Sequence, residues 1–237
     1  MSQMEILTER IELQVKGTPP MMAFVARPAD SEPRAGLLVF QEAYGVNAHI
    51  RNVTERFARE GYVAVAPELF HRTAPPGFEG EYGNFASVTP HYQPLTNGAI
   101  AQDIAVTYEW LRSRDQVHAP NISSVGFCLG GRASFLANTI VPLKSAVSFY
   151  GGGIAPALLD SAARLHAPQL LIWGGLDKHI PPEQRKAVTD ALTANGKVYV
   201  NAEFSNADHG FFCDERSSYN PVAARQAWAL TLEFLRS

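Results

Sequence analysis

Short apolar runs alternate along the chain with longer segments in which apolar residues recur every three or four positions. The predicted strands are residues 36–40, 62–66, 122–127, 145–150, 169–173 and 198–204, and several of them are near-continuous apolar runs, as is typical of buried strands. The periodic segments, each typical of a helix, are residues 49–60, 98–112, 182–194 and 221–235, with one more that begins at Leu129. This alternation predicts an α/β fold with a mostly parallel central sheet and helices on both of its faces.

The N-terminal segment follows a different pattern. Residues 11–15 and 22–27 each alternate apolar and polar side chains, and Gly17 and the Pro19-Pro20 pair lie between them. We therefore expect two antiparallel edge strands here. A length of 237 residues without an internal repeat suits one domain, so we predict a single domain over residues 1–237.

Residues 67–97 interrupt the alternation of strands and helices. This segment is rich in proline and glycine, and we expect a long loop without regular structure. A loop of this length inside a compact domain is usually functional or mobile. Two interpretations stay open. One is a flap over a pocket, and the other is an excursion packed on the surface. The flap would be built from Phe78, Tyr82, Phe85 and Tyr92.

Composition narrows the class of protein. The chain is 46% hydrophobic and 18% charged, which is typical of a soluble globular protein. Its 20 basic and 23 acidic side chains give a net charge of −3, so we expect neither a nucleic acid nor an anionic membrane as a partner. The apolar runs are also far shorter than the roughly 18 residues that a membrane-spanning helix requires.

The N-terminus and the cysteines indicate a cytoplasmic protein. Three glutamates lie among the first 17 residues, where a signal peptide would need a basic start and an unbroken apolar stretch. Two cysteines are too few to stabilise a chain of this length through disulfides. Neither the cysteines nor the histidines have the spacing of a metal site. No feature of the sequence, such as an apolar stripe along a helix, indicates a partner subunit. We expect a monomer and leave a homodimer open.

The sharpest chemical signal is the segment Val125-Gly-Phe-Cys-Leu-Gly-Gly131, which joins a predicted strand to a predicted helix. It predicts a nucleophile elbow with cysteine in place of serine. Gly126 and Gly130 allow the sharp turn, and Gly131 allows close packing. The turn leaves Cys128 at the N-terminus of a helix, where the dipole and free amides favour a thiolate. The alternative is a small buried cysteine among glycines that serve packing.

A nucleophile at an elbow needs a base and an orienting acid, which follow it in the chain in the order Asp or Glu, then His. Asp177 lies just past the carboxyl end of a predicted buried strand, and His209 lies in the loop after the final strand. His209 would take the thiol proton or form an ion pair with the thiolate, while Asp177 would fix its tautomer. Asp208 is a rival for the acid. Because it adjoins His209 in sequence, it is harder to align with the imidazole, and we prefer Asp177.

Several motifs together resemble the dienelactone hydrolase family of α/β-hydrolases. They are Gln41-Glu-Ala-Tyr-Gly-Val-Asn47, Gly61-Tyr-Val-Ala-Val-Ala-Pro67, Gly126-Phe-Cys-Leu-Gly-Gly131, Asp177 before Pro181, and His209-Gly-Phe211. The resemblance runs from Leu37 to Leu235. It implies an α/β-hydrolase fold and a carboxylic ester hydrolase similar to carboxymethylenebutenolidase, an activity of aromatic compound degradation that needs no metal or organic cofactor.

The resemblance also implies roles for individual residues. Cys128, Asp177 and His209 match the family triad, and Glu42 matches an extra acidic residue that helps to take the cysteine proton when substrate binds. The backbone amides of Leu129 and Ala43 would form the oxyanion hole. The reaction would open a lactone or ester through a thioester acyl-enzyme, which water activated by His209 then hydrolyses. For Glu42, the alternative from the residues alone is a solvated loop carboxylate or a charge that caps a helix.

The chain departs from the family pattern at the residues that bind the substrate. The best-known members of the family hold the substrate carboxylate with two arginines, one of them four residues after the catalytic histidine, and here that position is Cys213. A neutral lactone or ester is therefore an alternative to dienelactone, because a bidentate partner for carboxylate is missing. The candidate substrate contacts are Tyr44, Arg72, Tyr82, Trp173, Phe211 and Arg216.

Two alternatives from other functional classes stay open. One is a thiol redox or sensing protein in which Cys128 and Cys213 pair. The other is a binding protein on an inactive hydrolase scaffold, although no member of the triad is missing from the sequence.

Overall fold

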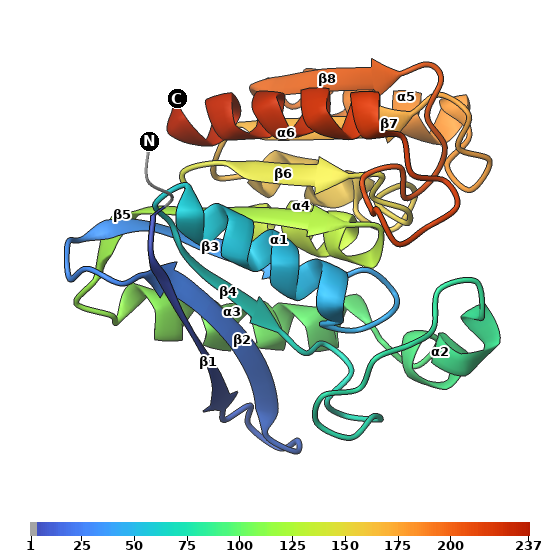
Figure 1. Ribbon diagram of the computed structural model, residues 1–237. Coiled ribbons are helices and arrows are strands. Elements are labelled where there is room, and N and C mark those ends of the chain that lie inside the picture. The colour runs from blue at the N-terminus through green and yellow to red at the C-terminus, as the bar shows by residue number, and fades with distance from the viewer. Residues whose placement is uncertain (1–3) are drawn as a thin grey trace. The chain divides into compact units, whose positions relative to one another are not determined.

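The computed structural model describes residues 4–237 and is drawn in Figure 1. By its internal contacts the chain forms two compact units, of which the first ends at Ser123 and the second is Ser124–Ser237. The single domain over residues 1–237 stays a prediction. Among residues 4–237, no helix combines the length and the apolar character that crossing a membrane requires.

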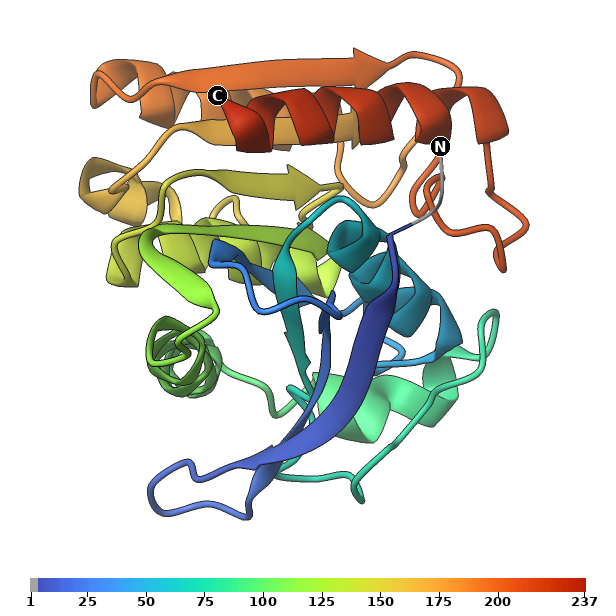
Figure 2. The same cartoon turned by 60° about the vertical axis from the view of Figure 1, so that its left-hand side comes forward.

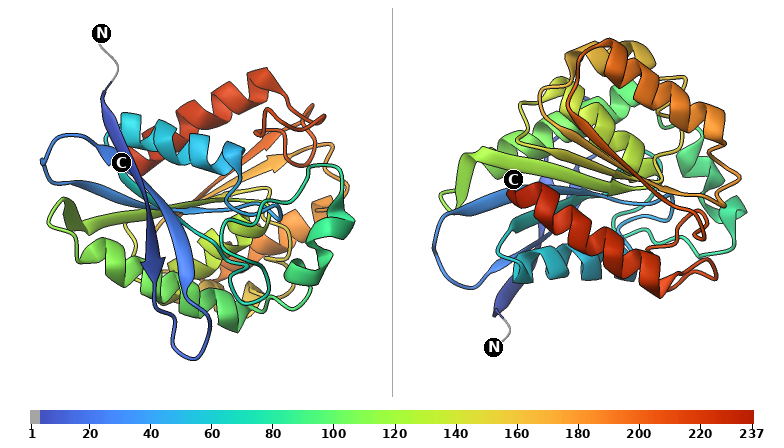
Figure 3. Two further views of the ribbon diagram at one scale, coloured as in Figure 1. Left: turned by 60° about the horizontal axis from the view of Figure 1, so that its bottom comes forward. Right: turned by 90° about the horizontal axis from the view of Figure 1, so that it is seen from above.

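The first unit holds a sheet with helices on both of its faces. Its strands are β1 (Ile6–Leu13), β2 (Met21–Pro28), β3 (Arg34–Phe40) and β4 (Val63–Pro67), and its helices are α1 (Ala48–Arg59), α2 (Phe85–Tyr92) and α3 (Asn97–Arg112). β3 and β4 are parallel, while β2 is antiparallel to both β1 and β4. In the left panel of Figure 3, α1 and α3 lie on opposite faces of these strands.

The prediction of two antiparallel N-terminal strands is confirmed, but the prediction that both are edge strands is wrong. β2 pairs with β1 on one side and with β4 on the other. Most side chains of β2 are buried, because α1 packs on this strand. β1, by contrast, is mostly exposed, and it begins at Ile6, earlier than the alternation indicates.

The prediction of an unbroken loop over residues 67–97 is also wrong, because helix α2 lies inside it. This helix even contains Pro90, whose ring disfavours a helical interior. Its Val88 is fully buried against Ala43 and Tyr44, and Phe78, Tyr82 and Tyr92 pack against the same cluster. Apolar burial thus outweighs the local preference. Phe85 remains 48% exposed. The choice between a flap and a surface excursion stays a prediction.

The second unit continues the alternation of strand and helix. It begins within β5 (Val117–Phe127) and contains α4 (Leu129–Ile140), β6 (Ala146–Phe149), the 3₁₀ helix η1 (Leu159–Arg164), β7 (Gln169–Gly174), α5 (Pro182–Ala194), β8 (Tyr199–Phe204) and α6 (Pro221–Arg236). The strands β5, β6, β7 and β8 are neighbours in that order, and every pairing is parallel. Figure 2 shows β6, β7 and β8 side by side.

Helices cover both faces of these parallel strands. α6 packs on β7, and α4 packs on β6, and the right panel of Figure 3 shows α6 on one face with α4 and α5 on the other. The strands β6 and β7 are buried along their whole length, as their near-continuous apolar runs predict. Because the strands are parallel, the segments that follow β5, β7 and β8 emerge at one edge of the sheet.

Candidate active site

Cys128 occupies the sharp turn between β5 and α4, as the sequence predicts. It has φ 55° and ψ −112° and stands at the N-cap of α4. A residue other than glycine at such a φ is strained, and strain of this kind is typical of functional sites. The turn is held by a hydrogen bond from the backbone N–H of Cys128 to the carbonyl oxygen of Phe149, with an N···O distance of 3.0 Å. The thiol is partly exposed.

The glycines of the elbow are required by close backbone contacts. A Cβ atom on Gly126 would collide with the carbonyl oxygen of Gly130, so no side chain fits there. A Cβ atom on Gly131 would lie 2.5 Å from the carbonyl oxygen of Phe149, which is also closer than real contacts allow. The predicted tasks of these two glycines, a sharp turn and close packing of helix on strand, are therefore confirmed.

Asp177 and His209 meet in the second unit through a short hydrogen bond. The Nδ1 atom of His209 lies 2.7 Å from Oδ2 of Asp177. The other carboxylate oxygen, Oδ1, accepts hydrogen bonds from the backbone N–H groups of His179 at 2.8 Å and Ile180 at 3.3 Å. These two backbone hydrogen bonds hold the carboxylate of Asp177 in place for its bond to the imidazole.

The rival acid, Asp208, contacts the backbone of His209. Its Oδ1 atom accepts a hydrogen bond from the backbone N–H of His209 at 2.6 Å. The carboxylate of Asp177 thus contacts the imidazole ring, while that of Asp208 shapes the loop. This geometry agrees with the preference for Asp177 that sequence adjacency suggests.

Opposite charges around His209 outweigh the cost of burying it. Burial disfavours the imidazolium, but the charge of Cys128, the hydrogen bond to Asp177 and a hydrogen bond to Cys128 raise the pKa of His209 to about 10. Burial likewise raises the pKa of Asp177, yet the hydrogen bond and charge of His209, with the backbone N–H of His179, leave this pKa below its usual value. The contacts of His209 with Cys128 and Asp177 therefore favour the imidazolium form of its ring.

Two further rings contact His209, and sequence reasoning singled out neither. The ring of Tyr150, which is fully buried at the end of β6, has its centroid 5.1 Å from that of His209. Tyr150 has a φ of 35°, a second strained residue near the imidazole. The ring of His179 is also 5.1 Å away, in an edge-to-face arrangement at 71°. The only signal in the sequence is the position of His179 two residues after Asp177.

In the first unit, Glu42 is fully buried and held by a tyrosine. The hydroxyl group of Tyr82 donates to Oε2 of Glu42 at 2.8 Å, and the ring of Tyr82 packs on Tyr44 with centroids 4.6 Å apart. The neighbouring Gln41 accepts a hydrogen bond from the backbone N–H of Leu69 at 3.0 Å. A solvated loop carboxylate, which was one alternative for Glu42, is therefore wrong.

The two residues predicted to form the oxyanion hole are both buried. Leu129 is the first residue of α4, and Ala43 follows Glu42 in the first unit. An amide in the first turn of a helix has no acceptor within that helix, which suits Leu129 to donate to a developing oxyanion.

The predicted substrate contacts have different surroundings. Trp173 is buried in β7, where its Nε1 atom donates to Oδ1 of Asn201 at 2.7 Å. Phe211 is fully buried against Tyr150, with ring centroids 5.6 Å apart. The guanidinium of Arg216 packs on the backbone of Gly210, which places it beside the loop that carries His209.

Arg72 is held by a buried carboxylate of the first unit. Its NH1 and NH2 atoms lie 2.7 and 2.8 Å from the two oxygens of Asp103, which is fully buried on α3. The neighbouring His71 joins this group, with Nε2 3.1 Å from Asp103 and Nδ1 2.9 Å from the carbonyl oxygen of Pro19. Sequence reasoning considered Arg72 only as a substrate contact.

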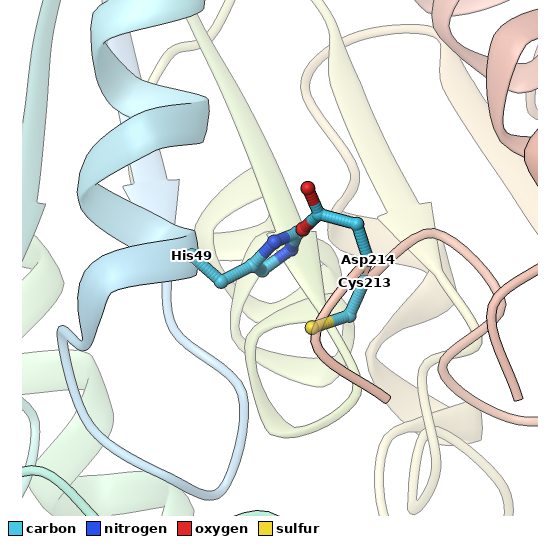
Figure 4. Close-up of side chains that lie close together, drawn as sticks. All are labelled: His49, Cys213 and Asp214. Atoms are coloured by element: carbon cyan, nitrogen blue, oxygen red, sulfur yellow. The ribbon is translucent and has the colours of Figure 1, made fainter. Parts of the chain in front are cut away.

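The position that departs from the family pattern lies on the loop between β8 and α6. Figure 4 shows Cys213 and Asp214 on this loop and His49 in the first turn of α1. Cys213 is buried, and neither Cys213 nor Cys128 forms a disulfide. The redox alternative, which pairs these two cysteines, gains no support from this arrangement.

A model of the dienelactone hydrolase family matches residues 21–237 of the chain. The chain belongs to this dienelactone hydrolase family. A protein of Synechocystis sp. named "Putative carboxymethylenebutenolidase" is 34% identical over 216 residues, which cover 86% of this chain and 87% of the relative. A protein of Escherichia coli O157:H7 with the same name is 35% identical over 231 residues, which cover 91% of this chain and 82% of the relative.

Among solved structures, the similarity extends over nearly the whole chain. The crystal structure titled "Putative Dienelactone Hydrolase" from Klebsiella pneumoniae subsp. pneumoniae has a TM-score of 0.89 and 29% identity, covering 98% of this chain and 99% of that one. The predicted α/β-hydrolase fold and family are confirmed. This dienelactone hydrolase family member is a carboxylic ester hydrolase that acts on a small ester or lactone.

Proposed function

We propose that this protein hydrolyses a lactone or ester by forming a thioester acyl-enzyme on Cys128. The observation that carries the proposal is the short bond between His209 and Asp177 beside a cysteine in a strained elbow. A nucleophile, a base that contacts it and an acid that orients the base are the three parts that acyl transfer requires. All three come from the second unit.

In the first half of the reaction, the Cys128 thiolate attacks the carbonyl carbon. The raised pKa of His209 favours the thiolate–imidazolium ion pair over a neutral thiol. A carbon–sulfur bond forms, and the carbonyl electron pair moves to oxygen, where the amides of Leu129 and Ala43 are proposed to donate. When the tetrahedral intermediate collapses, the bond from carbon to the alkoxy oxygen breaks. The leaving oxygen then takes a proton from His209.

In the second half, water hydrolyses the thioester. An acylated sulfur carries no negative charge, so one of the causes that raise the pKa of His209 disappears. The neutral imidazole then takes a proton from water as the water oxygen bonds to the carbonyl carbon. Collapse breaks the carbon–sulfur bond, releases the acid and restores the thiolate. Asp177 keeps the imidazole oriented throughout.

Glu42 and the residues around it complete the proposal. Glu42 would help His209 to take the proton from any Cys128 that is still a neutral thiol when substrate binds, as the matched motif implies. Its burial and its hydrogen bond from Tyr82 support a fixed carboxylate at this position. Further proposed substrate contacts are Tyr44, Arg72, Tyr82, Trp173, Phe211 and Arg216. Among the arginines, the position of Arg216 beside the His209 loop supports this role, whereas Arg72 already binds Asp103.

The substrate class has two candidates. One is an anionic lactone of the dienelactone type, which would place the protein in aromatic compound degradation. The other is a neutral ester or lactone, which the cysteine at position 213 favours, because a cysteine offers no bidentate partner for a carboxylate. We also propose a single cytoplasmic domain that acts as a monomer.

Hydrolysis of a small panel by three proteins tests the proposal. The panel contains cis- and trans-dienelactone, dihydrocoumarin and p-nitrophenyl acetate, and the proteins are the wild type, Cys128→Ala and the control Cys213→Ala. We expect turnover that is lost in Cys128→Ala and retained in Cys213→Ala. Turnover of dienelactone would assign the anionic substrate, and turnover of the neutral compounds alone would assign the neutral one. Equal turnover by the wild type and Cys128→Ala would refute the proposed nucleophile.

A further inference from the structure

The Asp177–His209 pair is buried, although the loop that carries Asp177 is exposed. The side chains of Asp177 and His209 are 1% and 10% exposed. In the same loop, between β7 and α5, Lys178 and His179 are exposed, and Leu176 is 56% exposed. Exposed residues of this loop therefore flank a buried carboxylate.

His179 is the residue of this loop whose ring contacts the imidazole of His209. The ring centroids lie 5.1 Å apart, and the planes meet at 71°, which is a favourable edge-to-face geometry. The second ring on His209 belongs to Tyr150, which is fully buried. His209 thus has one aromatic contact from the core and one from an exposed residue.

The backbone of His179 binds the same carboxylate as the ring of His209. Its N–H group donates to Oδ1 of Asp177 at 2.8 Å, while Oδ2 of the same carboxylate binds His209. The carboxylate therefore joins the backbone of His179 to the imidazole of His209. A substitution at position 179 that keeps the backbone N–H leaves this bond intact and changes the ring alone.

We propose that His179 is a positioning residue whose ring closes the solvent side of the Asp177–His209 pair. The imidazole of His209 turns about two side-chain bonds, and a ring packed on it restricts that rotation. The same ring keeps water away from the Nδ1–H group, so that the hydrogen bond to Asp177 acts in surroundings of low polarity. His179 acts on the reaction only through His209. This inference rests on the proposed role of His209 and adds a residue that the triad motif does not contain.

Three variants test the proposal: His179→Ala, His179→Phe and the control Lys178→Ala. Phenylalanine keeps a flat ring but cannot titrate, and Lys178 is an exposed neighbour of His179. For His179→Ala we expect kcat to fall by roughly tenfold with little change in KM, because a misplaced imidazole slows the chemistry. Phenylalanine should restore kcat to within about twofold of the wild type, and Lys178→Ala should not change it.

Proton NMR gives a readout that loss of stability would not mimic. The Nδ1 proton of His209, bonded to Asp177, should give a far-downfield signal in the wild type, in His179→Phe and in Lys178→Ala. In His179→Ala we expect this signal to broaden through exchange with water. The proposal is overturned if His179→Ala keeps the wild-type kcat or the sharp signal, or if His179→Phe falls as far as His179→Ala.

The substrate panel with Cys128→Ala and the NMR signal together separate this proposal from the proposed function. Wild-type turnover by Cys128→Ala would overturn the cysteine mechanism. The downfield signal reports the Asp177–His209 bond and does not need turnover, so it still decides whether the ring of His179 shields that bond.

Discussion

Nδ1 of His209 lies 2.7 Å from Oδ2 of Asp177, although 32 positions separate the two residues in the sequence. Parallel pairing of β7 with β8 explains the meeting, since Gly174 at the end of β7 stands opposite Phe204 at the end of β8. The loops that follow are joined by a hydrogen bond of 2.9 Å from the backbone N–H of Leu176 to the carbonyl oxygen of Ala207. Register and loop geometry therefore bring the acid to the base.

Substitution of the two aspartates that contact His209, Asp177 and Asp208, should have very different effects on activity. In Asp177→Asn the amide cannot hold His209 in the required tautomer, and we expect kcat to fall by roughly ten-thousand-fold. The control Asp208→Asn keeps an oxygen that accepts the backbone N–H of His209, so we expect activity within about threefold of the wild type. Steady-state kinetics on an ester substrate measure both. A larger loss of kcat in Asp208→Asn than in Asp177→Asn would show that Asp208, and not Asp177, is the acid that orients His209.

The charge state of His209 gives a pH-dependent prediction. Its pKa is about 10 in the folded protein against an ordinary value of 6.5. The stability that its imidazolium contributes is therefore fully present below pH 6.5 and is lost as pH rises through about 10. We expect the free energy of unfolding, measured with denaturant, to fall over this range.

The same shift can be followed at the ring itself. In Cys128→Ala the negative charge beside His209 is absent, so the pKa of His209 should move down toward its ordinary value. NMR titration of the imidazole Cε1 proton measures both proteins. A wild-type midpoint near 6.5, or the same midpoint in the two proteins, would contradict the ion pair.

Much of this site could be predicted from local sequence, because its parts follow strands that are easy to recognise. The elbow around Cys128 is set by short-range backbone contacts of glycines, and the positions of Asp177 and His209 follow from strand ends. The wrong predictions involve packing between distant segments. Proline and glycine suggest a loop over residues 67–97, but the burial of Val88 stabilises a helix there.

Side-chain partners were also beyond the reach of the sequence. Nothing in the sequence indicates that Arg72 binds Asp103, because this contact across 31 residues depends on how the segment after β4 packs on α3. For the same reason, the contacts of Tyr150 and His179 with His209 required the register of β6, β7 and the following loops. Local patterns specify backbone, whereas such pairs depend on tertiary packing.

The elbow should not tolerate a single added methyl group. Gly126→Ala would push a Cβ atom into the carbonyl oxygen of Gly130. This oxygen belongs to the backbone, so it cannot move aside as the end of a flexible side chain could. We expect a loss of more than about 2 kcal/mol in the free energy of unfolding. Gly98→Ala, in the first turn of α3, meets only Thr96 Oγ1 at 3.9 Å and should change stability by less than about 1 kcal/mol. Comparable stability for Gly126→Ala and the wild type in urea unfolding would refute this account of the elbow.

The hydrogen bond between Tyr82 and Glu42 should matter for activity more than for folding. Tyr82→Phe keeps the ring that packs on Tyr44 but removes the donor to Glu42. If Glu42 takes part in proton transfer, kcat/KM should fall by about tenfold, because a bond to a charged group contributes roughly 1.5 kcal/mol. Tyr219→Phe, which changes an exposed tyrosine, is the control and should keep wild-type kinetics. Unchanged kcat/KM in Tyr82→Phe would show that the hydroxyl group of Tyr82 plays no part in catalysis.

The most direct test of the central claim is the mass of the enzyme during turnover. Wild-type protein mixed with p-nitrophenyl acetate and quenched in acid should gain one acetyl group, which peptide mapping places on Cys128 and which hydroxylamine removes. Cys128→Ala should gain none and should not turn over the ester. An acetyl group on another residue, or wild-type turnover by Cys128→Ala, would contradict the thioester mechanism.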